Sequence, residues 1–380
     1  MNVIVLGTNH YNTLGLVWSL GEAGHDVTLL LYECNDSFVD KSKYIHKTII
    51  IHKNNDDVVD IIKGIALLMN QRPVVFVTND NDAAMLNERF DELSQVCFFE
   101  GGRPDGSINQ YRNKDRAEQL AVKCGFVIPN TSILMSLEVL DTEKLSYPLL
   151  VKANNSIHGG KAAMRKCDSS TDAERFISTL PTEYFPIQIQ EYINKEYEVM
   201  LLGCSLYGGT RVICPVANKK HRHFPEPTGL GSYSESLDVA KNEDLQQLAS
   251  KVAVYMQKIG YTGLFSAEFL YRSGQYYFLE VNLRNDGTSW LSTCSGFNLP
   301  DMVCRAFVDS DVSADSCRFV RTEFMNIKAD FNHVRSGRIK LGRWLNQLRK
   351  CTSYSHYNKC DVYPFWIYIW TNIKMVIKKR

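Results

Sequence analysis

Short apolar runs alternate with longer amphipathic stretches over the first hundred residues. The apolar runs are rich in β-branched residues and lie at residues 3–6, 27–31, 48–51 and 74–78. Runs of this length predict buried strands, and their alternation with helix-like stretches is typical of a parallel α/β sheet. We therefore predict an N-terminal α/β domain whose first strand includes residues 3–6.

The pattern changes near residue 112. A polar helix is expected to open at Asn113-Lys114-Asp115 and to stop at Gly125, and Pro129 requires an extended chain after it. Apolar strands are then predicted near residues 149–152, 188–192, 198–202 and 211–216, with a helix over 243–258. This mixture indicates an α+β region, and a chain of 380 residues is long enough for two or three packed domains.

Charge and cysteine content exclude several classes of protein. The 43 Lys and Arg residues balance 42 Asp and Glu residues, so no overall charge favours a nucleic-acid partner. The 11 cysteines include no Cys-x-x-Cys spacing, which argues against a zinc site and a disulfide framework. The apolar start has no preceding basic region and does not resemble a signal peptide. We expect a cytoplasmic protein with reduced thiols.

The first turn argues against a dinucleotide-binding oxidoreductase. It reads Gly7-Thr8-Asn9-His10-Tyr11 and lacks the second and third glycines that let a pyrophosphate approach a helix N-terminus. NAD or FAD binding is therefore disfavoured.

Residues 263–284 carry the most informative polar pattern. They predict two apolar strands, and a connection of three residues, 273–275, would place Glu268 directly across from Glu280. Because side chains alternate along a strand, Asn282 shares the face of Glu280, and so does Arg284 if the strand continues. Two paired carboxylates and an amide are suitable ligands for a magnesium ion that also contacts phosphates. The alternative interpretation is an edge hairpin whose glutamates face water.

Further polar residues follow the ends of predicted strands. Lys152 ends an apolar strand and precedes the small polar loop Ser156–Lys161, which contains Gly159 and Gly160 and suits phosphate contact or a plain turn. Glu191 and Glu198 flank a predicted turn, where they could meet an adenine edge and a ribose, or only Lys195.

The order of these residues resembles the ATP-grasp superfamily, especially the carbamoyl-phosphate-synthetase-like carboxylate–amine ligases. The resemblance covers roughly residues 1–308. It implies a Rossmann-like pre-ATP-grasp domain (1–112), a small lobe (113–190), a core lobe with a metal site (191–308) and an extension (309–380).

The resemblance also implies roles for single residues. Lys114 and Lys152 would contact the α- and β-phosphates, and Glu198 the ribose. Glu191, Tyr192 and Ile193 would form the adenine hinge, with Ser156, Gly159 and Gly160 in a loop that closes over ATP. Glu268, Glu280 and Asn282 would bind Mg²⁺, or Mn²⁺ in its place, and Arg284 would lie near the transferred phosphate. Leu283, where many relatives carry proline, departs from the pattern.

The predicted function is an ATP-dependent amide-forming ligase. A small-molecule carboxylate would become an acyl phosphate, an amine would displace the phosphate, and ADP would be released. The predicted catalytic residues are Lys152, Arg284 and Arg222, the last from a basic Gly/Pro-marked loop at 218–233 that could otherwise be a solvated turn. The alternative is an ATP-binding regulatory protein without turnover.

Residues 361–380 are aromatic and apolar and end in a basic run. They are too short and too interrupted to span a bilayer. A helix here would place Thr371, Lys374 and Lys378 opposite the aromatic side chains. Docking on the protein's own core or on a second copy in a homodimer is favoured, and peripheral contact with the cytoplasmic face of a membrane is the alternative.

Overall fold

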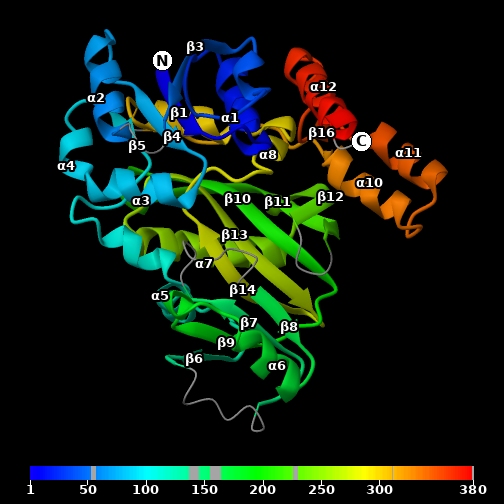
Figure 1. Ribbon diagram of the computed structural model, residues 1–380. Helices are drawn as coiled ribbons and strands as arrows, with labels where there is room; N and C mark the ends of the chain where they lie inside the picture. Colours follow the sequence, from blue (N-terminus) through cyan, green and yellow to red (C-terminus); the bar gives the residue numbers. More distant parts are fainter. Residues whose placement is uncertain (53–56, 137–144, 155–163, 226–229, 310, 379–380) are drawn as a thin grey trace.

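The computed structural model of the protein describes residues 1–52, 57–136, 145–154, 164–225, 230–309 and 311–378 (Figure 1). Three sheets organise these ranges, and they follow one another along the chain. The third sheet is completed by two short strands that come last in the chain. Within the described ranges every helix falls short of the length and apolarity needed to cross a membrane.

The first sheet is parallel and five-stranded, in the order β3-β2-β1-β4-β5. Its strands are β1 (Asn2–Gly7), β2 (Asp26–Tyr32), β3 (Ile45–Ile51), β4 (Val74–Val77) and β5 (Phe98–Phe99). Its helices are α1 (Tyr11–Glu22), α2 (Val58–Leu68), α3 (Asp80–Glu88) and α4 (Phe90–Leu93). Val3 and Val5 pack with α1 on one face, whereas Ile4 and Leu6 pack with α2 and α3 on the other. The predicted α/β fold is confirmed.

The second sheet is small and antiparallel, in the order β6-β9-β7-β8. Its strands are β6 (Thr131–Leu134), β7 (Leu149–Ala153), β8 (Met164–Cys167) and β9 (Ile187–Glu191). Helix α6 (Ser170–Ile177) packs on this sheet, and α5 (Lys114–Lys123) leads into it from a 3-10 turn at Ser107–Arg112. The helix predicted to open at Asn113 starts where expected, with the Asn113 side chain capping it by accepting from the Arg116 amide.

The third sheet has seven strands in the order β14-β13-β10-β11-β12-β15-β16. They are β10 (Tyr197–Leu206), β11 (Arg211–Phe224), β12 (Leu230–Asp238), β13 (Gly263–Arg272), β14 (Gln275–Asn282), β15 (Glu323–Met325) and β16 (Ser353–Tyr354). One face packs on α7 (Glu243–Ile259). The opposite face packs on the first domain through α1, α8 (Trp290–Cys294) and α9 (Leu299–Ala306).

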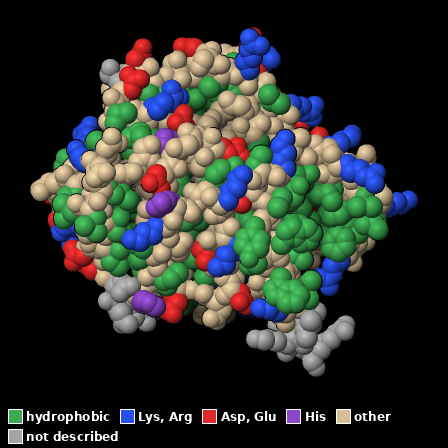
Figure 2. Space-filling view, turned by 90° about the horizontal axis from the view of Figure 1, so that it is seen from above, with side chains coloured by type: hydrophobic (Ala, Val, Ile, Leu, Met, Phe, Trp, Pro, Cys, Tyr) green, Lys and Arg blue, Asp and Glu red, His purple; other side chains and the backbone are tan. Residues whose placement is uncertain are grey.

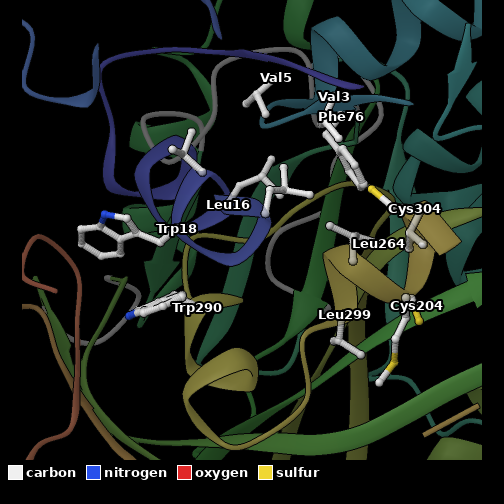
Figure 3. Close-up of a cluster of buried hydrophobic side chains, with 14 of the residues drawn as sticks. Val3, Val5, Leu16, Trp18, Phe76, Cys204, Leu264, Trp290, Leu299 and Cys304 are labelled. Carbon is white, nitrogen blue, oxygen red and sulfur yellow. The ribbon is translucent and has the colours of Figure 1, made fainter. Parts of the chain in front are cut away.

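The first domain and the third sheet share one hydrophobic core (Figure 3). Trp18 of α1 lies against Trp290 of α8, with ring centroids 5.3 Å apart. Leu264 of β13 and Cys204 of β10 belong to the same cluster as Val3 of β1. Because this contact is large and apolar, the two units are held in a fixed relation. The division of the chain at residues 112, 190 and 308 stays a prediction.

Three helices follow β15: α10 (Ile327–Arg335), α11 (Leu341–Lys350) and α12 (Tyr363–Lys378). In Figure 1 they lie together at one side of the molecule, beside the first domain. Tyr368 of α12 packs on Phe38, and Asp361 just before α12 accepts a 3.0 Å hydrogen bond from Trp18 Nε1. The predicted docking of this segment on the protein's own core is thus observed.

Candidate active site

The carboxylate pair is built by the hairpin of β13 and β14. Glu268 lies directly opposite Glu280, and Ser266 lies opposite Asn282. The predicted pairing is confirmed, but the predicted three-residue connection is wrong. The connection is the two residues Ser273 and Gly274, both at positive φ as in a type I′ turn.

A β-bulge explains why the two glutamates still face each other. The register shifts by one residue between Glu268 and Phe269, because Phe269 pairs with Phe278 while Glu268 pairs with Glu280. A two-residue turn alone would shift the pairing by one residue and send the two glutamates to opposite faces. The bulge adds one residue to β14 and shifts the pairing back. The hairpin therefore places both carboxylates on one face after all.

That face is apolar at one end and polar at the other. Its apolar end packs on the first domain through Met200, Leu202, Val216 and Leu264. Its polar end carries side chains at the two-residue spacing of a strand face, namely Glu198, Asn218, Lys220, Ser266, Glu268, Glu280 and Asn282. The polar end is therefore the candidate active site.

Lys220 is the central cation of this face. Its Nζ lies 2.8 Å from Glu268 Oε2 and 3.2 Å from Glu198 Oε2, and the side chain is nearly buried. Burial opposes its charge, but Glu268 and Glu198 together raise the pKa of Lys220 above its ordinary value. Sequence reasoning placed Lys220 in a basic loop and did not single it out. The structure places it on β11, so the loop prediction for residues 218–224 is wrong.

The two glutamates that Lys220 bridges behave differently. Burial raises the pKa of Glu268, and the neighbouring carboxylates of Glu280, Asp286 and Glu198 add to this effect against the attraction of Lys220. Burial also disfavours ionised Glu198, yet Lys220 and a 2.9 Å hydrogen bond with His223 Nε2 hold its pKa well below the usual value. Glu268 is therefore the carboxylate that gains most from an added cation.

These donors fit a magnesium ion that also meets phosphates. Glu268, Glu280 and Asn282 offer carboxylate and amide oxygens, the hard ligands that Mg²⁺ prefers. Among the described residues no three His, Cys, Asp or Glu side chains converge into a ready-made metal cluster.

Two lysines approach the same region, one from β7 of the small sheet and one from the start of α5. Lys152 on β7 is buried, with Nζ 3.4 Å from Glu118 Oε1 and 3.2 Å from Gln190 Oε1. Burial lowers the pKa of Lys152 to about 8, opposed by Glu118 and reinforced by Lys114. Lys114 Nζ donates to the Ala153 carbonyl oxygen at 3.2 Å. Lys114, Glu280 and Asn282 line one pocket, so the two lobes face each other across this space.

Arg284 reaches the site although β14 ends at Asn282. Its Nη2 lies 3.2 Å from Asn282 Oδ1 and 3.0 Å from Asp80 Oδ2. Burial opposes its charge, but Asp80 raises the pKa of Arg284. Asp80, at the start of α3, also binds Arg112 Nη1 at 3.2 Å. Sequence reasoning missed Asp80, because the contact joins residues about two hundred positions apart.

The predicted hinge connects β9 of the small sheet with β10 of the core sheet. Glu191 is exposed and Ile193 is buried, and the Tyr192 ring lies 5.0 Å from Lys166 Nζ. The Glu191 amide donates to the Asn130 carbonyl oxygen at 2.8 Å. Ser156, Gly159 and Gly160 of the predicted phosphate loop lie outside the described residues.

Arg222 is engaged away from the carboxylates. Its guanidinium makes two hydrogen bonds to the fully buried Asp330, at 2.9 and 2.7 Å. Asp330 also accepts from Ser232 Oγ at 2.7 Å and from Trp344 Nε1 at 3.0 Å. The contacts of Arg222 therefore support a structural role, and its predicted catalytic role draws no support from them.

Asp330→Asn should lower the free energy of unfolding by about 3–5 kcal/mol, because it leaves a largely buried guanidinium without its counter-charge. Urea denaturation measures the loss. The matched control is Asp311→Asn, which breaks the exposed pair with Arg211 of the same strand and should cost at most about 1 kcal/mol. Equal losses in the two variants would contradict a structural role for the buried pair.

Comparison with known proteins agrees with this geometry. The ATP-grasp domain family matches residues 119–296. A D-alanine–D-alanine ligase from Fusobacterium nucleatum is 24% identical over 255 residues, which cover 63% of this chain and 84% of the relative. Residues 119–296 of the chain therefore form an ATP-grasp domain.

Solved structures share the fold at low identity. The L-amino acid ligase from Bacillus licheniformis superposes with a TM-score of 0.64 at 17% identity, over 85% of this chain and 78% of that one. A biotin carboxylase from Campylobacter jejuni, solved as a β,γ-ATP complex, gives a TM-score of 0.66 at 16% identity, over 84% of this chain and 74% of that one. These likenesses support the fold, an N-terminal parallel α/β unit followed by antiparallel lobes.

Proposed function

We propose that the protein joins a small-molecule carboxylate to an amine, using ATP and passing through an acyl phosphate. The observation that carries this proposal is the placement of Glu268, Glu280 and Asn282 on one sheet face, with Lys114 of the opposite lobe lining the same pocket as Glu280 and Asn282. The D-alanine–D-alanine ligase and the L-amino acid ligase, each named for joining amino acids, support the same reaction class.

Each part of the site has a proposed task. Lys114 and Lys152 hold the ATP phosphates, residues 191–193 line the adenine, and Glu198 meets the ribose. Glu268, Glu280 and Asn282 would hold Mg²⁺, which when bound neutralises phosphate charge. Lys220 and Arg284, both cationic and nearly enclosed, hold the oxygens that become more negative as the acyl phosphate forms and as the amine displaces the phosphate.

The acid and the amine are expected to bind where the first domain meets this site. Asn12 donates to the Thr78 carbonyl oxygen at 2.9 Å and to the Asn285 carbonyl oxygen at 3.2 Å, which fixes the first turn beside Arg284. Burial lowers the pKa of His10, the charge of Asp286 opposes this shift, and the charge of Arg284 adds to it. We therefore place the binding site of the amine at this turn. The expected location of the protein is the cytoplasm.

The test is ADP release by the purified protein with Mg-ATP and a mixed panel of carboxylates and amines. Turnover that requires both an acid and an amine supports the ligase, and dividing the panel then identifies the pair. Tight ATP binding without turnover on any pair of a broad panel would favour the regulatory alternative instead.

Binding of Mg-ATP should be coupled to proton uptake above neutral pH. With its pKa lowered to about 8, Lys152 is partly neutral there, and phosphate contact requires its ammonium form. ATP affinity should therefore fall as pH rises through 8. In the free protein, stability should instead rise between pH 8 and the ordinary lysine value of about 10.4, because only the unfolded chain still holds the proton.

Titration calorimetry in buffers of different ionisation enthalpy measures the proton uptake. Lys152→Arg is the matched control, because arginine stays charged over this range. The uptake at pH 8 should be larger in the wild type than in this variant. The same uptake in both would exclude Lys152 as its source.

A further inference from the structure

Charge is strongly segregated along the chain, although the total is nearly neutral. Residues 327–380 contain 12 Lys and Arg and only two acidic residues, Asp330 and Asp361. The remaining 326 residues then hold 31 Lys and Arg against 40 Asp and Glu. One end of the protein is therefore basic while the rest is acidic.

Burial of the two acidic residues sharpens this segregation. Asp330 is enclosed with Arg222 and Trp344, and Asp361 is enclosed with Trp18 and Ser42. The basic side chains described in this segment are all exposed: Lys328, Arg335, Arg338, Lys340, Arg343, Arg349, Lys350, Lys359 and Lys374. In the described part of residues 327–378, the charge offered to solvent is thus entirely positive.

Helix α12 adds aromatic side chains to this surface. Tyr363, Trp366, Trp370 and Ile373 are between 46% and 61% exposed, and their spacing puts them within about 80° of the helix circumference. The other side of α12 packs on the first domain through Tyr368. Contrary to the predicted separation of polar and aromatic faces, Lys374 shares the exposed face, with Nζ 5.7 Å from the centre of the Trp370 ring.

The apolar area extends onto the neighbouring helices. Leu341 and Leu345 of α11 and Phe331 of α10 are also exposed, and Lys328 of α10 hydrogen-bonds Asn372 of α12 at 2.6 Å. Figure 2 shows a broad hydrophobic patch bordered by Lys and Arg side chains on the side where these helices lie. We name the exposed residues of α10, α11 and α12 the basic aromatic face.

We propose that the basic aromatic face binds the surface of a bilayer that contains anionic phospholipids, with α12 lying in the plane of the interface. Tryptophan and tyrosine favour the headgroup level, where an apolar ring and a polar group are both satisfied, and Lys and Arg are attracted to anionic lipids.

Other partners fit the same face less well. A symmetric dimer would bring two strongly positive surfaces together, which repel each other. Nucleic acid would be attracted by the charge, but Leu341, Leu345 and Ile373 offer aliphatic surface that matches acyl chains rather than bases or phosphates. An anionic membrane surface can bind both the basic and the apolar side chains of the basic aromatic face.

The experiment is flotation of the full chain with vesicles of phosphatidylcholine alone and of phosphatidylcholine with phosphatidylglycerol. We expect binding to the anionic vesicles only, weakened by added salt, with a blue shift of tryptophan emission. Trp366→Ala/Trp370→Ala should reduce the affinity at least about tenfold. The matched control, Leu67→Ala/Leu68→Ala, removes two exposed apolar side chains of α2 and should leave binding unchanged.

A second variant tests the charge separately. Arg343→Gln/Arg349→Gln/Lys350→Gln should weaken binding by on the order of fivefold for each charge that lies at the surface, whereas Lys123→Gln/Lys258→Gln on α5 and α7 should not. Circular dichroism and urea denaturation establish that each variant is folded. Equal binding to both vesicle types, no flotation at all, DNA binding in place of vesicle binding, or a dimer that Trp366→Ala/Trp370→Ala disrupts would each overturn the proposal.

Discussion

Glu280→Gln is expected to lower the rate of ADP release by about three orders of magnitude, because it removes a charged ligand from the proposed phosphate-bound metal. Glutamine has nearly the same shape, so the hairpin and its bulge should persist. The pair of Glu268 and Glu280 would lose one negative charge, and the attraction for Mg²⁺ would fall with it.

Initial rates of ADP release over a range of Mg²⁺ concentrations measure this effect. Part of the activity should return at high Mg²⁺ if the loss lies in metal binding. Glu243→Gln, at the exposed start of α7, is the matched control and should retain full activity. Normal turnover by Glu280→Gln would show that the β13–β14 hairpin is not part of the active site, even if the wild-type protein proves to be a ligase.

Lys152→Met should lower kcat/KM for ATP by about two to three orders of magnitude, because a buried cation that contacts a phosphate interacts strongly at low dielectric. Methionine keeps most of the side-chain length and volume. It also leaves the buried Glu118 without its cationic partner, so the variant is expected to lose stability as well.

The double variant Lys152→Met/Glu118→Gln separates the two effects. It removes both members of the buried pair and should recover stability without recovering activity. Lys123→Met on the exposed side of α5 serves as the control for a lysine lost from the same region. Recovery of ATP turnover in the double variant would show that Lys152 acts only through folding.

Local pattern was sufficient to predict the parallel sheet, the helix after Asn113 and the strands of the β13–β14 hairpin. Each of these depends on the burial of side chains near one another in sequence, which the apolar spacing records directly. The pairing of Glu268 with Glu280 was predicted correctly from an incorrect connection. The two-residue turn and the bulge compensate for each other, and a bulge leaves no trace in the apolar pattern.

Site residues that lie close together in the sequence were predicted. Site residues that depend on contacts between distant parts of the chain were missed or given the wrong partners. Lys220 resembled Arg222 in sequence, because both lie in one basic run. Two bulges in β11 near Lys220 and Arg222 alter the simple alternation, and the two side chains take different partners, Glu268 for Lys220 and Asp330 for Arg222. Asp330 lies more than a hundred residues from Arg222, and no spacing rule connects them.

The sequence by itself determined the strands and helices of the first domain, the strands of the β13–β14 hairpin, and the basic character of residues 327–380. These properties follow from the order of apolar, polar and charged residues along the chain. Only the tertiary structure decided that Lys220 lies between two carboxylates, that Asp80 holds Arg284, and that α12 packs Tyr368 against the first domain while exposing Trp366 and Trp370. Those outcomes depend on which surfaces meet when the sheets pack, and that choice is made by the whole core rather than by any local segment.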